Sequence, residues 1–395
     1  MRKDWEYKKL GEVCTIERGG SPRPITDFIT NDSNGINWIK IGDTKEGSKY
    51  ITSTKEKIKP EGVKKSRFVH KGDFILSNSM SFGRPYILDI DGCIHDGWLV
   101  IHDGKKFFSK DYLYYLLASP IMYSRFSQLA VGGVVNNLNS ALVRKVIVPI
   151  PPISIQLSIA NELDKINELI QLKKEQLKDY DQLAQSIFYE MFGDPVENEK
   201  GWEVKKLGDI CEVTSAKRVF IEEVVDSGVP FIRGTELTAL NRLTRGEKMK
   251  YSLFITKEHY ERLKAITGVP KYGDLLIPSI NSEGIAWIVN TEEPLYFKDG
   301  RVLWVHVNQD VFKSECLQKI MNILLKHTYK SMGGATFSEL KLFVLRELKV
   351  PIPPIESQQQ FAARIEAIER QKQQISETIK DLETLLASRM QYWFD

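Results

Sequence analysis

Apolar residues recur with alternating steps of four and three along two long stretches of the chain, from Ile159 to Met191 and from Phe361 to Trp393. A repeat averaging about 3.5 residues over roughly four to five heptads is the pattern of a coiled-coil helix. Paired prolines precede both stretches, and Gly193 follows the first. Because proline and glycine mark helix ends, the pattern predicts long helices over residues 154–192 and 354–395.

Elsewhere the apolar residues form short runs bounded by turn residues, which is the pattern of β-strands. Helical runs at 111–117 and 316–326 lie between the last strand of each region and the proline pairs. Strands and helices mixed in this order indicate two α/β globules, over residues 1–153 and 193–353. The predicted strands are Ile36–Ile41, Asp73–Leu76, Trp98–Ile101, Pro230–Arg233, Leu275–Ile277 and Val302–Val305.

The two globules are copies of one pattern. Val148–Ile153 and Val350–Ile355 both read VPIPPI, about 202 residues apart, and a glutamine follows each, at Gln156 and Gln358. Lys-Lys-Leu-Gly opens both copies, and Gly-Asp and Gly-Gly pairs recur within them at 72–73 and 273–274 and at 132–133 and 333–334. Between these anchors the copies diverge. The chain is therefore predicted to be globule, helix, globule, helix, with one scaffold carrying two sets of loops.

The two long helices are expected to pair antiparallel within one chain, related by a pseudo-twofold axis, because the second begins beside the globule where the first ends. A register in which paired residue numbers sum to 552 places Lys173 opposite Ile379 and Lys372 opposite Tyr180. A shift of one heptad would bury Lys173 against Lys372, which is costly. An intermolecular coiled coil is the alternative. The predicted seam comprises Ile159, Leu163, Ile166, Ile170, Leu177, Ile187, Phe361, Ile365, Ile368, Ile375, Ile379, Leu382 and Leu386.

Charge is distributed unevenly along the 395 residues. The net charge is +3, but Lys and Arg outnumber Asp and Glu by 23 to 16 in residues 1–153 and by 23 to 22 in residues 193–353. In both helices the acidic residues predominate, by 7 to 4 in 154–192 and by 7 to 5 in 354–395. Globules that bind an anionic polymer, with helices as struts, would show this pattern, and so would ordinary solvated surfaces.

The sequence lacks the common signatures of catalysis and of metal binding. It has no GxGxxG, P-loop, HExxH or GxSxG motif, and no Asn/Asp-Pro-Pro-aromatic tetrad of amino-methyltransferases. Its four cysteines form no Cys-x-x-Cys pair. His95-Asp96 is the closest His/acid pair and is interpreted as a structural hydrogen bond. We therefore expect no catalytic residue, metal or cofactor in this chain. A polar start and the lack of a long apolar run indicate a cytoplasmic protein.

This order of elements resembles the specificity subunit of a type I restriction-modification system. The resemblance rests on the two variable globules, the VPIPPI segments followed by glutamine and a long helix, and the Lys-Lys-Leu-Gly openings, and it covers essentially the whole chain. It implies two target recognition domains, each reading one half of a bipartite double-stranded DNA sequence, with the paired helices setting the gap. It also implies that the subunit itself is not an enzyme.

The resemblance further implies partners. Two methyltransferase subunits would dock on the helices and carry S-adenosylmethionine, and restriction subunits can join them. Acidic positions expected to face outward on the helices, where they could pair with basic subunits or form an ordinary solvated face, are Glu162, Glu168, Glu175, Glu366 and Glu369.

Residues that contact DNA should be polar, lie on loops and differ between the two copies. Arginine, asparagine and serine pair with base edges, and basic side chains neutralise phosphates. The candidates in the first globule are Arg18, Ser21, Arg23, Lys40, Asn78, Ser79, Arg84, Asn136 and Asn137. Those in the second are Lys217, Arg218, Arg233, Thr235, Asn281, Ser282 and Thr336.

Two other interpretations remain open from the sequence. The chain could be a standalone nuclease or methylase with an unrecognised site, in which case the pure protein would turn over DNA without a partner. It could also be a coiled-coil scaffold that does not bind nucleic acid, in which case any DNA affinity would be insensitive to salt.

Overall fold

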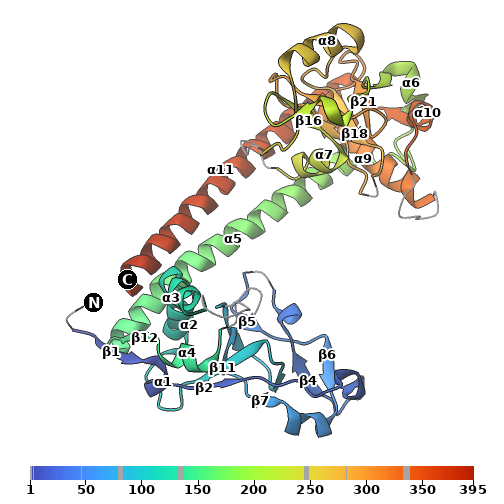
Figure 1. Cartoon of the computed structure of the whole chain (residues 1–395). Coiled ribbons are helices and arrows are strands. Elements are labelled where there is room, and N and C mark those ends of the chain that lie inside the picture. Colours follow the sequence, from blue (N-terminus) through green and yellow to red (C-terminus); the bar gives the residue numbers. More distant parts are fainter. Residues whose placement is uncertain are drawn as a thin grey trace. The chain divides into compact units, whose positions relative to one another are not determined.

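The computed structural model describes residues 2, 4–45, 47–78, 83–130, 138–243, 249–281, 283–331 and 339–395. The chain divides into two compact units, one of Met1–Leu172 with Ile379–Asp395 and one of Lys173–Thr378. Each unit therefore combines one α/β globule with a part of both long helices, α5 (Ile153–Phe192) and α11 (Ile355–Phe394), which are green and red in Figure 1.

The first globule contains two five-stranded sheets, ordered β3-β6-β4-β10-β7 and β2-β11-β8-β9-β5, and a two-stranded pair, β1-β12. Its strands are β1 (Glu6–Lys9), β2 (Thr15–Arg18), β3 (Ile29–Thr30), β4 (Ile36–Ile39), β5 (Tyr50–Ile51), β6 (Glu56–Ile58), β7 (Arg67–Val69), β8 (Phe74–Ser77), β9 (Pro85–Leu88), β10 (Gly92–Ile94), β11 (Trp98–His102) and β12 (Ile147–Ile150). Its helices are α1 (Leu10–Val13), α2 (Lys110–Ala118), α3 (Pro120–Ala130) and α4 (Ser140–Arg144), with 3-10 turns η1 (Ile25–Asp27), η2 (Ile41–Asp43) and η3 (Pro60–Lys65).

The second globule has two four-stranded sheets, ordered β14-β21-β18-β19 and β15-β17-β16-β20, and the pair β13-β22. Its strands are β13 (Glu203–Lys206), β14 (Glu212–Ser215), β15 (Val224–Val225), β16 (Val229–Ile232), β17 (Phe254–Ile255), β18 (Leu275–Pro278), β19 (Trp287–Ile288), β20 (Tyr296–Phe297), β21 (Val302–His306) and β22 (Lys349–Ile352). Its helices are α6 (Leu207–Ile210), α7 (Gly234–Leu240), α8 (Lys257–Thr267), α9 (Ser314–Ser331) and α10 (Leu342–Glu347), with the 3-10 turn η4 (Ile221–Glu223).

The strands predicted from apolar runs are confirmed as β4, β8, β11, β16, β18 and β21, and the mixed α/β class is confirmed with them. The first four residues of the central strands β11 and β21 are all apolar because both faces of the sheet are buried there. In β11, Leu99 and Ile101 lie in one core while Trp98 and Val100 lie in another. In the second globule β21 divides its side chains between two cores in the same way. Alternate side chains of a strand point to opposite faces, so each central sheet separates a core that includes helices from a second, smaller core.

The repeated sequence motifs meet each other in space. The Lys-Lys segment of β1 pairs antiparallel with the Val-Pro-Ile segment of β12, and β13 pairs with β22 in the same register. Gly11, the glycine that follows the first Lys-Lys-Leu, has no room for a side chain, because an added Cβ would lie 2.7 Å from Cβ of Arg144. Both ends of each globule are thus joined into one two-stranded ribbon where a long helix begins.

One buried glutamine ties each long helix to its globule. The Oε1 of Gln156 accepts the N–H of Ser109 at 2.8 Å, and its Nε2 donates to the carbonyls of Phe107 and Pro151. Gln358 makes the equivalent set with Lys313, Val311 and Pro353. Each glutamine satisfies main-chain groups that would otherwise be buried without partners, which explains the glutamine three residues after both VPIPPI segments.

Contacts between the helices agree with the proposed register. In the first unit the guanidinium of Arg389 binds Glu162, and in the second Lys372 Nζ lies 2.8 Å from Asp181. The residue numbers of these pairs sum to 551 and 553. In both units an early part of one helix thus contacts a late part of the other, as antiparallel pairing within one chain requires. Lys173 Nζ donates to Gln176 and not toward a second lysine.

The predicted seam positions are all buried or half-buried. At the helix ends Met191 and Trp393, the last apolar residues of the two series, are half-buried, and Trp393 Nε1 donates to Glu162 on the other helix. Beside them the structure buries Phe188 and Phe192 in the core of the second globule and Met390 and Phe394 in that of the first. Near the C-terminal end of each helix more apolar positions are buried, because the helix packs there against a globule as well as against the other helix.

Two of the acidic positions expected to face outward have intrachain partners instead. Glu162 accepts hydrogen bonds from Arg389 and from Trp393 Nε1, and the bonds from Arg389 are the main cause of its lowered pKa. Glu369 lies 3.0 Å from Lys372 Nζ. Burial alone would lower the pKa of Lys372, but Asp181 and Glu369 outweigh burial and raise it. Glu162 and Asp181 therefore link the two helices, whereas Glu369 pairs with a lysine of its own helix.

No helix within the described ranges is both long and apolar enough to cross a membrane. All four cysteines are free and buried. In the same part of the chain, no group of three His, Cys, Asp or Glu side chains is arranged to hold a metal ion.

Candidate nucleic-acid interface

The same Asp-Gly turn occurs at an equivalent place in both globules. In the first, Ile39 at the end of β4 pairs in parallel with Ile94, and Asp96-Gly97 follows two residues later. In the second, Ile232 at the end of β16 pairs in parallel with Phe297, and Asp299-Gly300 follows two residues later. Both turns then lead into the central strand, β11 or β21. The register thus identifies Asp96 with Asp299.

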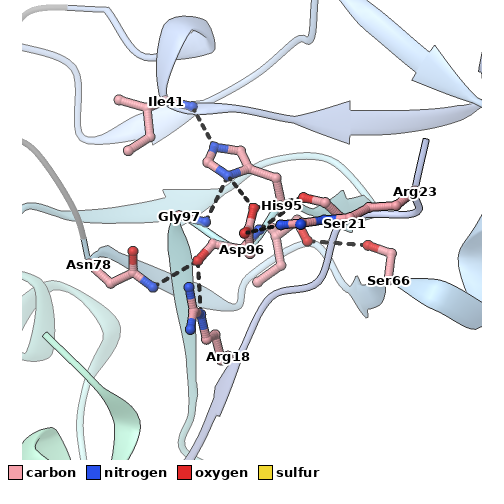
Figure 2. Close-up of polar contacts among 10 residues, drawn as sticks. Arg18, Ser21, Arg23, Ile41, Ser66, Asn78, His95, Asp96 and Gly97 are labelled. Atoms are coloured by element: carbon pink, nitrogen blue, oxygen red, sulfur yellow. Dashed lines mark hydrogen bonds and ion pairs between the residues drawn. The ribbon is translucent and has the colours of Figure 1, made fainter. Parts of the chain in front are cut away.

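In the first globule the Asp96 turn gathers polar side chains from three segments, as Figure 2 shows. The hydroxyl of Ser21 donates to Oδ1 of Asp96 at 2.7 Å, and Nη2 of Arg23 lies 3.7 Å from Oδ2. The main-chain oxygen of Asp96 accepts hydrogen bonds from Nε of Arg18 at 3.0 Å and from Nδ2 of Asn78 at 2.9 Å. The hydrogen bond from Ser21 is the main cause of the lowered pKa of Asp96, so the turn is anionic at neutral pH.

This turn borders an open surface pocket with a volume of about 700 Å³. Basic side chains of Arg23 and Lys40 stand on its wall, and the apolar part includes the buried ring of Trp38. Lys40 is held by Glu56, with 2.5 Å between Nζ and Oε1. Cationic groups around an apolar floor suit an anionic ligand that also presents flat or methylated surfaces. The pocket is lined by Ser21, Pro22, Arg23, Ile25, Thr26, Ile29, Trp38, Lys40, Glu56, His95 and Asp96.

His95 has a structural role, as interpreted from the sequence. The main-chain N–H groups of Gly97 and Ile41 point at its Nδ1 and Nε2, at 2.7 Å and 3.2 Å. Burial is the main cause of the lowered pKa of His95, which favours the neutral ring. A neutral imidazole has a single unprotonated ring nitrogen and accepts only one of these two N–H groups. The ring is packed between η2 and the Asp96 turn.

In the second globule the equivalent aspartate holds an arginine directly. Nε of Arg218 donates to Oδ2 of Asp299 at 3.1 Å, and the Arg218 guanidinium lies 5.9 Å from the centre of the exposed Phe220 ring. The main-chain N–H of the neighbouring Lys217 donates to the hydroxyl of Tyr296. This segment is thereby fixed to β20 with two basic residues beside the turn.

A second basic position is also shared. Lys40 and Arg233 each follow the strand that pairs in parallel with β10 or β20, and each precedes a short helical turn, η2 or α7. Their main-chain N–H groups donate to Asp43 and Glu236, three residues on. The guanidinium of Arg233 also binds Glu236, with Nη2 2.6 Å from Oε1. Each globule therefore places one cation at a helix start beside its Asp-Gly turn.

Glu236 should make the stability of the second unit depend on acid pH. Hydrogen bonds from Arg233 lower the pKa of this buried carboxyl from 4.5 to about 2. Because the folded-state pKa lies below the unfolded value, the stabilisation is complete above about pH 4.5 and is lost as the pH falls toward 2. Urea unfolding between pH 2.5 and 6 should therefore be less pH-dependent in Glu236→Gln than in the unchanged protein. If the free energy of unfolding changes equally with pH in the two proteins, the stabilising role of ionised Glu236 is contradicted.

The structure excludes two of the predicted candidates. Asn78 and Asn281 are only 3% exposed. The amide of Asn78 bonds the Asp96 turn, and that of Asn281 closes a loop through both Nδ2 and Oδ1 to Ile285. Their amides hold the fold and cannot reach a base edge. The candidates that remain accessible are Arg18, Ser21, Arg23, Lys40, Arg84, Lys217, Arg218, Arg233 and Thr235. Ser79, Asn136, Asn137, Ser282 and Thr336 lie outside the described residues.

The carboxylates that organise both sites were missed from the sequence. Asp96, Asp299 and Glu236 were not chosen because candidates were sought among residues that donate to DNA. A signal was present, since an Asp-Gly dipeptide precedes a predicted strand in both copies. To recognise these dipeptides as one repeated turn, one must know that β4 pairs in parallel with β10 and β16 with β20.

Comparison with known proteins identifies the family. The model of the type I restriction modification DNA specificity domain matches residues 2–179 and again 199–384. The chain belongs to this specificity family. It contains two copies of the domain, and the family accounts for recognition rather than catalysis within type I systems. The resemblance recognised in the sequence is confirmed.

Relatives of the specificity family match over most of their length. The MjaIX specificity subunit of Methanocaldococcus jannaschii is 26% identical over 396 residues, covering 93% of this chain and 87% of its own. A putative specificity subunit of Haemophilus influenzae, S.HindORF215P, is 24% identical over 78% of both chains. A chain from a study of type I complex assembly and conformational transition shares the fold, with a TM-score of 0.63 at 19% identity over 99% of this chain and 97% of its own. The specificity subunit from M. genitalium does so less closely, with a TM-score of 0.51 at 14% identity over 99% and 96% of the two chains.

Proposed function

We propose that this specificity subunit directs a type I modification complex to a bipartite DNA sequence. The first globule reads one half of the target and the second globule reads the other. The observation that carries the proposal is the paired site: in both domains a carboxylate-organised turn and a helix-start cation lie at equivalent positions, with different side chains around them. Equivalent positions with different donors are what two readers of unlike sequences need.

The charge distribution supports a difference in how the two globules bind DNA. The first globule carries most of the excess positive charge, and phosphate contacts by such residues position a protein on the duplex without reading sequence. The second globule is close to neutral. Its specificity therefore depends more on groups fixed in place, such as Arg218 and Arg233, than on a general attraction to the backbone.

We further propose that α5 and α11 serve as the spacer and as the docking surface for two methylation subunits. Each helix has 40 residues and is about 60 Å long. Half-sites on one face of B-DNA lie roughly 34 Å apart, or a multiple of that distance, so helices of this length suffice as a spacer. The methylation subunits would supply S-adenosylmethionine, restriction subunits can join the assembly, and the complex would act in the cytoplasm, where its DNA target lies.

Methylation mapping tests the proposal. The chain is combined with its methylation subunits and S-adenosylmethionine, genomic DNA is modified, and the modified sites are sequenced. We expect one asymmetric motif with two specified parts and a gap of constant length. A continuous motif, or a gap that varies, would contradict the two-reader arrangement. The chain without partners, incubated with DNA, magnesium and methyl donor, should show no turnover, and turnover there would favour a standalone enzyme.

A further inference from the structure

In each domain one exposed arginine beside the Asp-Gly turn is held through its Nε atom alone by the residues that the structure describes. Nε of Arg18 donates to the main-chain oxygen of Asp96 at 3.0 Å, and Nε of Arg218 donates to Oδ2 of Asp299 at 3.1 Å. Within the described part of the chain, the terminal amino groups of both arginines have no hydrogen-bond partner. Both side chains are exposed, Arg218 to 66%.

The two arginines reach the same turn from different places in the sequence. Arg18 is the last residue of β2 and pairs with Leu99 of β11, whereas Arg218 follows the end of β14 by three residues. Arg218 is held further by the nearby ring of Phe220. A shared anchoring point reached from different positions would aim the two guanidinium groups differently.

An arginine fixed through Nε presents its two terminal amino groups as a planar fork. Such a fork matches the O6 and N7 acceptors of guanine in the major groove, which is the commonest specific arginine contact. Anchoring the side chain beforehand reduces the rotamer entropy lost on binding. A phosphate contact has no such need, because a flexible cation serves as well there.

We infer that Arg18 and Arg218 are functionally equivalent specificity residues, each held by the Asp-Gly turn of its domain and each reading a guanine in its own half of the target. The inference rests on the proposed function and adds a base to it: both halves of the recognition sequence contain a G·C pair that depends on one arginine. Asp299 is a positioning residue for Arg218, whereas the main chain holds Arg18.

The test uses the complex with methylation subunits and a DNA library in which every position of the mapped target is varied. In Arg218→Lys, discrimination for guanine at one position of one half should fall by about 5- to 150-fold, as expected for loss of one bidentate contact. The other half should be unchanged. In Arg18→Lys, discrimination for guanine should fall at one position of the other half, and the half affected by Arg218→Lys should be unchanged. The matched control is Arg242→Lys, since Arg242 is also 66% exposed and ion-paired, to Glu283 at 3.0 Å; no position should change.

Asp299→Asn separates positioning from folding. It should reduce discrimination at the Arg218 position, and it should add nothing when Arg218 is already lysine. Uniform weakening at all positions in Arg218→Lys would identify a phosphate contact and overturn the inference. If one or both halves of the wild-type target lack a G·C pair, the inference is overturned too, while two-part recognition stays intact. A wild-type complex without sequence preference would instead refute the proposed function itself.

Discussion

Replacing Arg18, Arg23 and Lys40 together by alanine is expected to weaken binding of the modification complex to its target DNA by about 100-fold at moderate salt. The three cations surround the Asp96 turn and its pocket in the more positive globule. If Arg23 and Lys40 each neutralise one phosphate while Arg18 reads a base edge, the slope of log affinity against log salt concentration should also fall by about 1.8. Fluorescence anisotropy with labelled duplexes at several salt concentrations measures both quantities.

A charge-matched control makes this result interpretable. Lys105, Lys110 and Lys145 belong to the same globule and are exposed. They are not among the residues that line the pocket, and among the described residues no hydrogen bond or ion pair joins them to the Asp96 turn. Their triple alanine variant removes the same net charge and should cost little affinity. Equal losses in the two variants would mean that general charge, rather than this surface, binds DNA.

Phe361→Ala is expected to destabilise the second unit by about 3 to 5 kcal/mol, the usual cost of truncating a buried aromatic residue. Phe361 is fully buried near the start of α11 and packs against Phe188 and Phe192 near the end of α5, with ring centres 5.7 Å and 5.3 Å apart. The three rings join both helices to the core of the second globule. Removing the central ring leaves a cavity where three elements meet.

Hydrogen exchange read out on peptides of the second unit is the appropriate measurement, because a chain with two units need not unfold in one step. Amides of α9 and of residues 361–378 should lose protection in Phe361→Ala. The control is Phe343→Ala in the same unit, where the ring is 68% exposed and the change should stay within about 0.5 kcal/mol. Similar effects in both variants would show that the Phe361 cluster does not join the helices to the core.

The Asp-Gly turns show which part of the candidate site was open to prediction. Arg18, Ser21, Arg23 and Arg218 were found from the sequence because polar loop residues that differ between copies are visible in it. Their anchors were not, since Arg18 and Asp96 are 78 residues apart and Arg218 and Asp299 are 81 apart. Asn78 and Asn281 were misjudged for the same reason: a polar residue after a strand is predicted to be exposed until the partners that bury it are known.

The sequence by itself determined the repeat, the two long helices, their antiparallel register and the family. Those features are written in residues close to one another or in copies of the same segment, so periodicity and self-similarity reveal them. Only the tertiary structure decided which carboxylates hold the exposed arginines, which asparagines are buried, and that the ends of α5 and α11 pack in globule cores. These depend on strand pairing and side-chain packing between distant segments, and no local pattern records which distant partner a residue will meet.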